Sequence, residues 1–396
     1  MRPALRSPRA AIEPDPAPQP PKRSDAARHP VVVFLNSIIS LLVIAAVIVG
    51  GALFWGKQRF EAASALPEDR TVVVTRGMDV ETITNLLQRE GVIAESGIVP
   101  DRWIFYGGVW FNQAQAQLKA GEYLIPAKSS MNDVMQLLIE GRSILHAVTL
   151  PEGLTSEQIV ERLKADPILD GEIEEIPAEG SLLPETYKFT RGTTRKQLIE
   201  RMVTAHNRAV DEIWARRVDG LPVETPEELV ILASIVEKET SRADERTRVA
   251  GVFVNRLQRK MKLQSDPTII YGLVGGKGKL GRPIRQSEID KATPYNTYVI
   301  DRLPPGPIAN PGRAALEAVA NPSRTDELFF VADGTGGHAF AATIEEHNRN
   351  VARWRAIERQ REAERAKEAE RAKEEAAAGD EPAEPAAGEP ETKTEP

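Results

Sequence analysis

Two glutamates, Glu237 and Glu239, follow directly on an almost wholly apolar run, and a carboxyl group in that position can act as a general acid. The run from Leu229 to Val236 covers nearly the whole circumference of a predicted helix. Because a helix that is apolar all round is buried, carboxyls at its end lie where the core meets solvent. Desolvation there raises the pKa of a carboxyl, which lets it keep its proton near neutral pH.

Helical spacing favours one of the two carboxyls. Glu239 stacks over Ile235 and Val236, whereas Glu237 stacks over Ala233, so Glu239 has the bulkier and more apolar surroundings. The alternative is that both glutamates are solvated charges among the neighbouring basic residues.

Later loops carry neutral hydrogen-bonding and aromatic side chains of the kinds that hold sugar hydroxyl and acetamido groups, although each loop could equally be a structural turn. Glu185 is a possible second carboxylate in the same cleft, and His338, after two glycines, could hydrogen-bond a loop or take part in catalysis. The candidate sugar-binding residues are Gln264, Ser265, Asp266, Tyr271, Tyr295, Asn296 and Tyr298.

The elements that position these residues can be read from their start and stop signals. Thr225 is a suitable N-cap for the apolar helix, Pro226 suits its first position, and Glu228 completes a predicted capping box. Before it, strands are predicted over residues 71–75, 119–126 and 146–150. Each precedes a helix, capped in turn by Asp79, by Ser130 and by Thr155 with Gln158. These short units are either scaffold or glycan-binding modules.

Five motifs in the same order resemble those of the endolytic murein transglycosylases of the MltG (YceG-like) type. The resemblance covers roughly residues 30 to 350. The motifs are Ala233 to Thr240 (ASIVEKET), Leu263 to Gly272 (LQSDPTIIYG), Thr293 to Tyr298 (TPYNTY), Leu303 to Ile308 (LPPGPI), and Phe330 to His338 with Glu346 to Asn348.

The resemblance implies an α+β protein with a single N-terminal transmembrane helix, a small LysM-like module and a larger mixed α+β catalytic domain. It implies cleavage of the β-1,4 bond between N-acetylmuramic acid and N-acetylglucosamine in nascent glycan strands. The catalytic glutamate of that family corresponds to Glu239 here. The family also suggests partnership with penicillin-binding proteins and termination of strand elongation.

A lytic transglycosylase can work with one carboxyl, whereas most glycosidases need two. Protonated Glu239 would donate to the glycosidic oxygen, then take a proton from the C6 hydroxyl as a 1,6-anhydro ring closes. Two rivals remain: a muramidase that pairs Glu239 with Asp266 or Glu185 and adds water, and an anchored peptidoglycan-binding scaffold without turnover. None of these readings requires a metal or an organic cofactor.

Residues Val31 to Trp55 are almost continuously apolar, long enough to cross a bilayer as a helix. Six basic residues precede them, so the positive-inside rule places residues 1–30 in the cytoplasm and the catalytic part in the periplasm, anchored to the cell inner membrane. The alternative is a cleaved signal peptide, since Ala63 to Ala65 fits the small-residue cleavage pattern.

These readings divide the chain of 396 residues into a disordered cytoplasmic arm (1–30), a transmembrane helix (31–56), the LysM-like module (57–150), the catalytic domain (151–351) and a charged helix with a disordered tail (352–396). The net charge of −7 argues against broad nucleic-acid binding. There is no cysteine, and the five histidines have no zinc-ligand spacing, so no metal site is expected.

Overall fold

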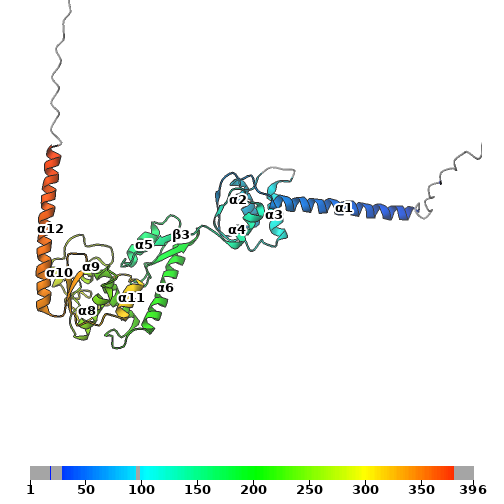
Figure 1. The fold of residues 1–396 in the computed structure, drawn as a ribbon. Coiled ribbons are helices and arrows are strands. Elements are labelled where there is room, and N and C mark those ends of the chain that lie inside the picture. The colour runs from blue at the N-terminus through cyan, green and yellow to red at the C-terminus, as the bar shows by residue number, and fades with distance from the viewer. Residues whose placement is uncertain (1–17, 19–28, 95–98, 379–396) are drawn as a thin grey trace, which may run out of the picture. The chain divides into compact units, whose positions relative to one another are not determined.

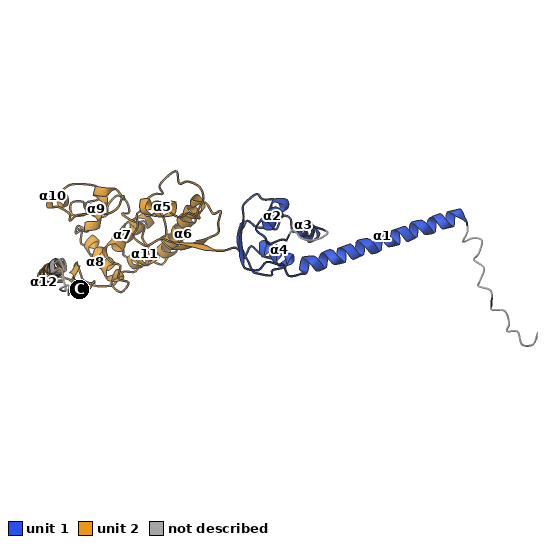
Figure 2. Ribbon diagram, turned by 90° about the horizontal axis from the view of Figure 1, so that it is seen from above, with its two compact units in different colours: residues 1–143 blue, residues 144–396 orange. Residues whose placement is uncertain are grey.

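The computed structural model describes residue 18, residues 29–94 and residues 99–378. It contains two compact units, Met1–Ser143 and Ile144–Pro396 (Figures 1 and 2). The predicted cytoplasmic arm and the predicted disordered tail lie almost entirely outside the described residues. Mixed α+β structure, as predicted, is present in both units.

The first unit begins with α1 (Pro30–Glu61), a helix of 32 residues with a mean hydropathy of 2.9 in its most apolar window. It is long and apolar enough to cross a membrane, as the sequence predicted for residues 31–55. The side chains of this stretch are exposed, which sets α1 apart from the apolar core helices. The composition of α1 therefore suits a lipid environment.

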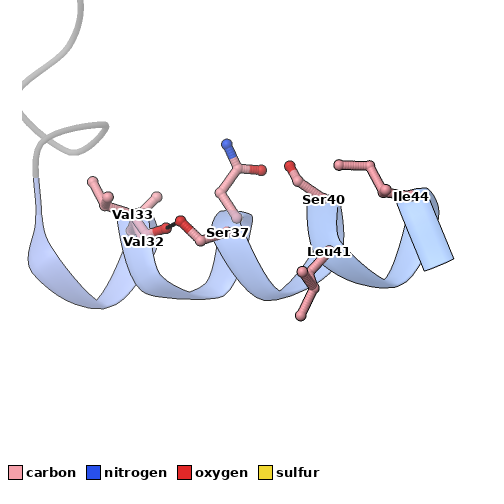
Figure 3. Close-up of a pocket in the computed structure, with 7 residues that line it drawn as sticks. Val32, Val33, Ser37, Ser40, Leu41 and Ile44 are labelled. Carbon is pink, nitrogen blue, oxygen red and sulfur yellow. Dashed lines mark hydrogen bonds between the residues drawn. The ribbon is translucent and has the colours of Figure 1, made fainter.

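One face of α1 carries a shallow hollow (Figure 3). Ser37 and Ser40 lie along it beside Asn36, and the Ser37 hydroxyl donates to the Val33 carbonyl at 2.9 Å. A hydroxyl that donates to a carbonyl of its own helix has a hydrogen-bond partner even inside an apolar span. The side chains that line the hollow are apolar or neutral.

A small module follows α1. Its two strands pair antiparallel with Val72 opposite Tyr123, and buried side chains of its helices, Leu87 and Phe105 among them, complete one core. The elements are β1 (Arg70–Val74), α2 (Val80–Arg89), α3 (Asp101–Phe111), β2 (Gly121–Ile125) and α4 (Met131–Glu140). The predicted strands and the caps at Asp79 and Ser130 are confirmed, whereas α3 was not predicted. That this module is LysM-like stays a prediction.

The second unit contains two more antiparallel strand pairs and the remaining helices. The elements are β3 (His146–Thr149), α5 (Ser156–Lys164), β4 (Thr186–Phe189), α6 (Arg195–Ala215), α7 (Pro226–Glu239), α8 (Arg246–Gln258), α9 (Asp266–Val274), α10 (Gln286–Ile289), α11 (Arg313–Ala320), β5 (Phe329–Ala332), β6 (His338–Ala341) and α12 (Ile344–Ala378). Strands β3 and β4 pair with each other in this unit. The sequence instead placed residues 146–150 in the preceding LysM-like module, which was predicted to end at residue 150. The domain limits drawn from the sequence stay a prediction.

Helix α7 lies in one of the two hydrophobic clusters of the second unit. All eight residues from Leu229 to Val236 are buried, and α8 and α11 pack against the helix. Thr225 caps it as predicted, its side chain accepting from the Glu228 N–H. The predicted capping box is wrong, because the Glu228 carboxylate accepts from the Glu224 N–H at 2.7 Å instead of returning to Thr225. The buried part of α7 fixes the position of its last turn.

Candidate active site

Glu239 is the last residue of α7. Thr240 after it adopts an extended conformation (φ −142°, ψ 131°), so the chain leaves the helix where its buried face ends. The Glu239 side chain is consequently half-buried, with apolar residues on the turn behind it. The helix thus delivers one carboxyl to the edge of the core, as the sequence predicted.

The other glutamate of the pair faces a different set of groups. The Glu237 carboxylate accepts from the Gly312 N–H at 2.9 Å and lies 4.0 Å from the Arg246 guanidinium. Burial raises the pKa of Glu237 as well, but its hydrogen bond fastens α7 to the segment that opens α11. Glu237 therefore joins two elements, and Glu239 is the carboxyl that faces the later loops.

The Glu239 carboxyl accepts a short hydrogen bond of 2.5 Å from the Ser265 hydroxyl. Burial raises the pKa of Glu239 to about 7. The Ser265 hydrogen bond and the charges of His338 and Arg256 lower the pKa, and the Asp266 carboxylate raises it. A carboxyl with a pKa near 7 can both donate and accept a proton at neutral pH, which is what a single acid/base residue requires.

Ser265 is held by its backbone, which leaves its hydroxyl for Glu239. Its N–H donates to the Thr297 hydroxyl at 2.9 Å, and its carbonyl accepts from the Thr268 hydroxyl at 2.6 Å. Gln264 before it has a left-handed backbone (φ 53°) and donates its N–H to the Thr297 carbonyl at 3.1 Å. Two buried threonines from separate segments therefore fix the loop that carries Ser265.

Arg256 on α8 is a buried cation that the sequence did not single out. Its guanidinium donates to the carbonyls of Leu328, Lys262 and Leu263 at 2.7, 3.1 and 2.9 Å, and to the Gln264 side-chain oxygen at 3.1 Å. Four oxygen acceptors satisfy the fork geometry of a buried guanidinium. Arg256 thereby ties the Gln264 loop to the strand pair β5–β6 and places a positive charge beside Glu239.

Asp266 and Tyr298 form a pair beside Ser265. The Tyr298 hydroxyl donates to the Asp266 carboxylate at 2.6 Å, and burial raises the pKa of Tyr298. Asp266 is exposed and also begins α9, so its carboxylate stabilises the first turn of that helix. Gln264, Ser265, Asp266 and Tyr298 thus lie together around Glu239, linked by hydrogen bonds or by charge.

Tyr271 and Tyr295 form a second group, with ring centroids 4.9 Å apart. The Tyr271 hydroxyl donates to the Glu179 carboxylate at 3.3 Å, and burial raises the pKa of Glu179. Glu179 also accepts from the Ser156 N–H and the Asn310 amide, at 2.9 and 3.1 Å. Sequence reasoning missed Glu179, because it follows a segment without helical or strand periodicity.

The remaining predicted residues have other partners. Asn296 is buried, and its amide nitrogen donates to the carbonyls of Glu288, Ile289 and Lys291, so its amide supports a turn. Glu185 is exposed immediately before β4, and its carboxylate is absent from the main charges that shift the pKa of Glu239. The roles assigned to both from the sequence stay predictions.

His338 at the start of β6 pairs with Glu245, which stands at the N-cap position of α8 but makes no side-chain hydrogen bond to that helix. The ring Nδ1 lies 2.8 Å from one Glu245 oxygen, and the His338 N–H donates to the other at 3.0 Å. His338 therefore does bond a loop, one of the two possibilities that the sequence left open. No group of three or more His, Asp or Glu within residues 29–94 and 99–378 is arranged to hold a metal ion.

Comparison with known proteins places this arrangement in a family. The sequence model of the YceG-like family matches residues 72–353. An endolytic murein transglycosylase of Streptococcus pneumoniae is 32% identical over 80% of this chain and 64% of its own length, so the chain spans less than two thirds of that relative. An endolytic murein transglycosylase of Bacillus subtilis is 29% identical over 76% of the chain and 89% of its own length. The crystal structure of a yceG-like protein from Listeria monocytogenes, 30% identical, covers 72% of this chain and 99% of its own, with a TM-score of 0.42.

Proposed function

The chain belongs to the YceG-like family, and we propose that it is a membrane-anchored lytic transglycosylase that cuts peptidoglycan glycan strands internally. The observation that carries the proposal is the environment of Glu239. Its half-buried carboxyl has a pKa raised to about 7 and accepts a hydrogen bond from the neutral Ser265 hydroxyl. The names of the Streptococcus and Bacillus relatives support the substrate class. Ser265 and Asp266 of the second motif, Tyr298 of the third and His338 of the fifth bond to the Glu239 side chain or interact with it through charge.

The proposed reaction uses Glu239 twice. In its protonated form it donates to the oxygen that leaves C1 of N-acetylmuramic acid, and the acetamido group of the same sugar meets the positive charge that develops. As a carboxylate, it then removes the proton from the C6 hydroxyl, whose oxygen attacks C1 and closes the 1,6-anhydro ring. The first step leaves Glu239 as a carboxylate, and the second step protonates it again. Because both forms are needed in each cycle, the pKa of Glu239 has to lie near the working pH.

The proposed roles of the neighbours follow from their contacts. Ser265 donates to the carboxylate form of Glu239, which stabilises that form and limits how far burial raises the pKa. Arg256 holds the loop that carries Ser265. Gln264, Tyr271, Tyr295 and Tyr298 offer side chains for sugar hydroxyl groups and for stacking on sugar faces.

A hydrolase would need a second carboxylate positioned to activate water. Asp266 is the nearer candidate in sequence, but its carboxylate accepts the Tyr298 hydroxyl at 2.6 Å. Glu185 stands at β4, and its neighbours are Tyr187 and Arg313. These contacts favour ring closure by the C6 hydroxyl over attack by water.

We assign α1 as a single-pass anchor in the cell inner membrane, with residues 1–30 in the cytoplasm and the catalytic part in the periplasm. The length and apolar character of α1 and the six basic residues before it support this orientation. An enzyme held there reaches nascent strands beside the penicillin-binding proteins that polymerise them, and cutting those strands would terminate their elongation.

The chemistry of the new chain ends tests the proposal. Purified full-length protein is incubated with nascent and with mature peptidoglycan, and the released fragments are identified by mass spectrometry. We expect cuts within the strands that leave 1,6-anhydro-N-acetylmuramic acid at the new chain ends. These ends are about 18 Da lighter than the ends that a hydrolase leaves, because the reaction adds no water. Reducing ends would identify a hydrolase, and the absence of any product from both substrates would identify a binding scaffold.

A further inference from the structure

Helix α3 in the first unit exposes a row of large aromatic side chains. Trp103, Trp110 and Phe111 are 56%, 54% and 82% exposed. Tyr106 lies between the two tryptophans, with ring centroids 6.2 Å from each. Trp103, Tyr106 and Trp110 share one side of the helix because they are three, four and seven positions apart. Phe111, eight positions after Trp103, lies at the edge of the same broad stripe, and we call the four rings the aromatic face.

The opposite side of α3 is fastened to the end of α1. The Arg59 guanidinium on α1 donates twice to the Asp101 carboxylate, at 3.0 and 2.9 Å. Phe60 on α1 packs on Phe105, with ring centroids 6.4 Å apart. A Cβ at Gly108 would come within 2.4 Å of the Phe60 ring, so the glycine permits this close contact. Figure 2 shows α3 beside this end of α1.

The contact lies just outside the apolar span. Phe60 follows Trp55, the last residue of that span, by five positions, which is about 7.5 Å along a helix. The headgroup region on each side of a bilayer is about 5–8 Å thick. If α1 crosses the membrane as proposed, α3 is therefore held at headgroup depth.

We infer that the aromatic face of α3 rests in the outer headgroup layer of the membrane, as a second lipid contact beside the α1 anchor. Trp and Tyr concentrate at this depth because their rings are apolar at one end and polar at the other. An interfacial helix buries its apolar face about 5–10 Å into that layer. The contact would hold the module flat against the membrane and set its height above the lipid. The inference rests on the proposed membrane anchor.

Aromatic side chains also stack on sugars, but the surroundings of this face favour lipid. A sugar site combines rings with hydrogen-bonding side chains. Here the one carboxylate of α3, Asp101, lies on the opposite side and bonds to Arg59, and the side chain of the most exposed member, Phe111, has no polar atom. Arg102 lies over the Trp103 ring, 5.4 Å from its centroid, where a cation suits anionic lipid phosphates.

The test uses depth-dependent quenching of a fluorescent label. Since the chain has no cysteine, one introduced cysteine gives one labelled site. Full-length Phe111→Cys is labelled and reconstituted in phosphatidylethanolamine and phosphatidylglycerol vesicles with brominated acyl chains. We expect quenching at position 111 to be about twofold or more above that of Asn85→Cys, an exposed site on α2 of the same unit. Adding Trp103→Ser and Trp110→Ser to Phe111→Cys should remove most of the difference.

Leu42→Cys, inside the apolar span, separates the two proposals. Quenching at position 42 without quenching at 111 would overturn the lipid contact and leave the anchor standing. No quenching at 42 would overturn both. The label at position 111 could instead show no quenching by brominated lipid but a change in emission when purified glycan strands are added. That result would assign the aromatic face to sugar binding and contradict the inference.

Discussion

Glu239→Gln should slow strand cleavage by about 10³-fold or more, near the upper part of the range for loss of a general acid/base. Glutamine keeps the shape of the side chain and can still accept the Ser265 hydrogen bond. However, it cannot donate a proton to the glycosidic oxygen or remove one from the C6 hydroxyl. Both steps fail together because one residue performs both. The initial rate of fragment release by the purified full-length protein measures the loss.

Glu237→Gln is the matched control, two residues away on the same helix. The side-chain oxygen of glutamine can still accept the Gly312 N–H, so α7 stays attached to the α11 segment. We expect its rate to stay within a few-fold of the wild type. Equal loss in both variants would contradict the assignment of Glu239, and so would a Glu239→Gln protein with nearly full activity.

Stability measurements distinguish lost chemistry from lost folding. The folded-state pKa of Glu239, about 7, is higher than its usual value of 4.5. The folded state therefore binds the proton more tightly, and the stability linked to this group is present below pH 4.5 and is lost as pH rises to about 7. Glutamine carries no charge, so Glu239→Gln should exceed the wild type in free energy of unfolding above pH 7, by roughly 1–3 kcal/mol. Urea unfolding at pH 4 and at pH 8.5 measures the difference.

Ser265→Ala should raise the pKa of Glu239 further, because the Ser265 hydroxyl stabilises the carboxylate form. A hydrogen bond to a charged group is worth about 1.5–3 kcal/mol, which corresponds to a pKa increase of about one unit or more. The step measured by kcat/KM needs protonated Glu239, so its fall at alkaline pH should move to higher pH. The same increase makes protonated Glu239 a weaker acid, so at pH values where it is fully protonated the acid step should slow by up to about tenfold. A pH profile of kcat/KM and of kcat measures both effects.

Ser181→Ala is the control for Ser265→Ala. It also removes a hydroxyl that donates one hydrogen bond, to the Ala178 carbonyl at 2.7 Å, but this bond lies in a separate turn. Its pH profile should match the wild type. An alkaline limb in Ser265→Ala that stays in place, or moves to lower pH, would show that the short hydrogen bond does not control the titration of Glu239.

The sequence predicted those parts of the site that depend on local pattern. The apolar circumference of α7 and its Thr225 cap follow from local pattern and are confirmed. Helical spacing also favoured Glu239 over Glu237, and the catalytic role of Glu239 stays a prediction. The capping box failed because Glu228 found a nearer N–H at Glu224, a competition that a motif does not reveal.

Residues whose roles depend on distant segments could not be predicted. In the sequence, Arg256 is one of several charged residues of the helix α8. It is buried and hydrogen-bonded only because Leu328 and the Gln264 loop pack against it. Glu179 becomes part of the site through Tyr271 and Asn310, which are far along the chain. Long-range packing decides both cases. Asn296 is a local case: its side-chain type suits sugar binding, yet its amide donates to three carbonyls at and just after the end of α10.

The titration of the Glu239 carboxyl itself tests the central claim most directly. Protein labelled with ¹³C at the glutamate carboxyl carbons is followed by NMR from pH 4 to pH 9, and the signal missing from Glu239→Gln identifies the residue. We expect a midpoint close to 7 for this carboxyl. A midpoint near the usual 4.5 would mean that Glu239 is ionised at neutral pH, and a single acid/base residue at this position would then be contradicted.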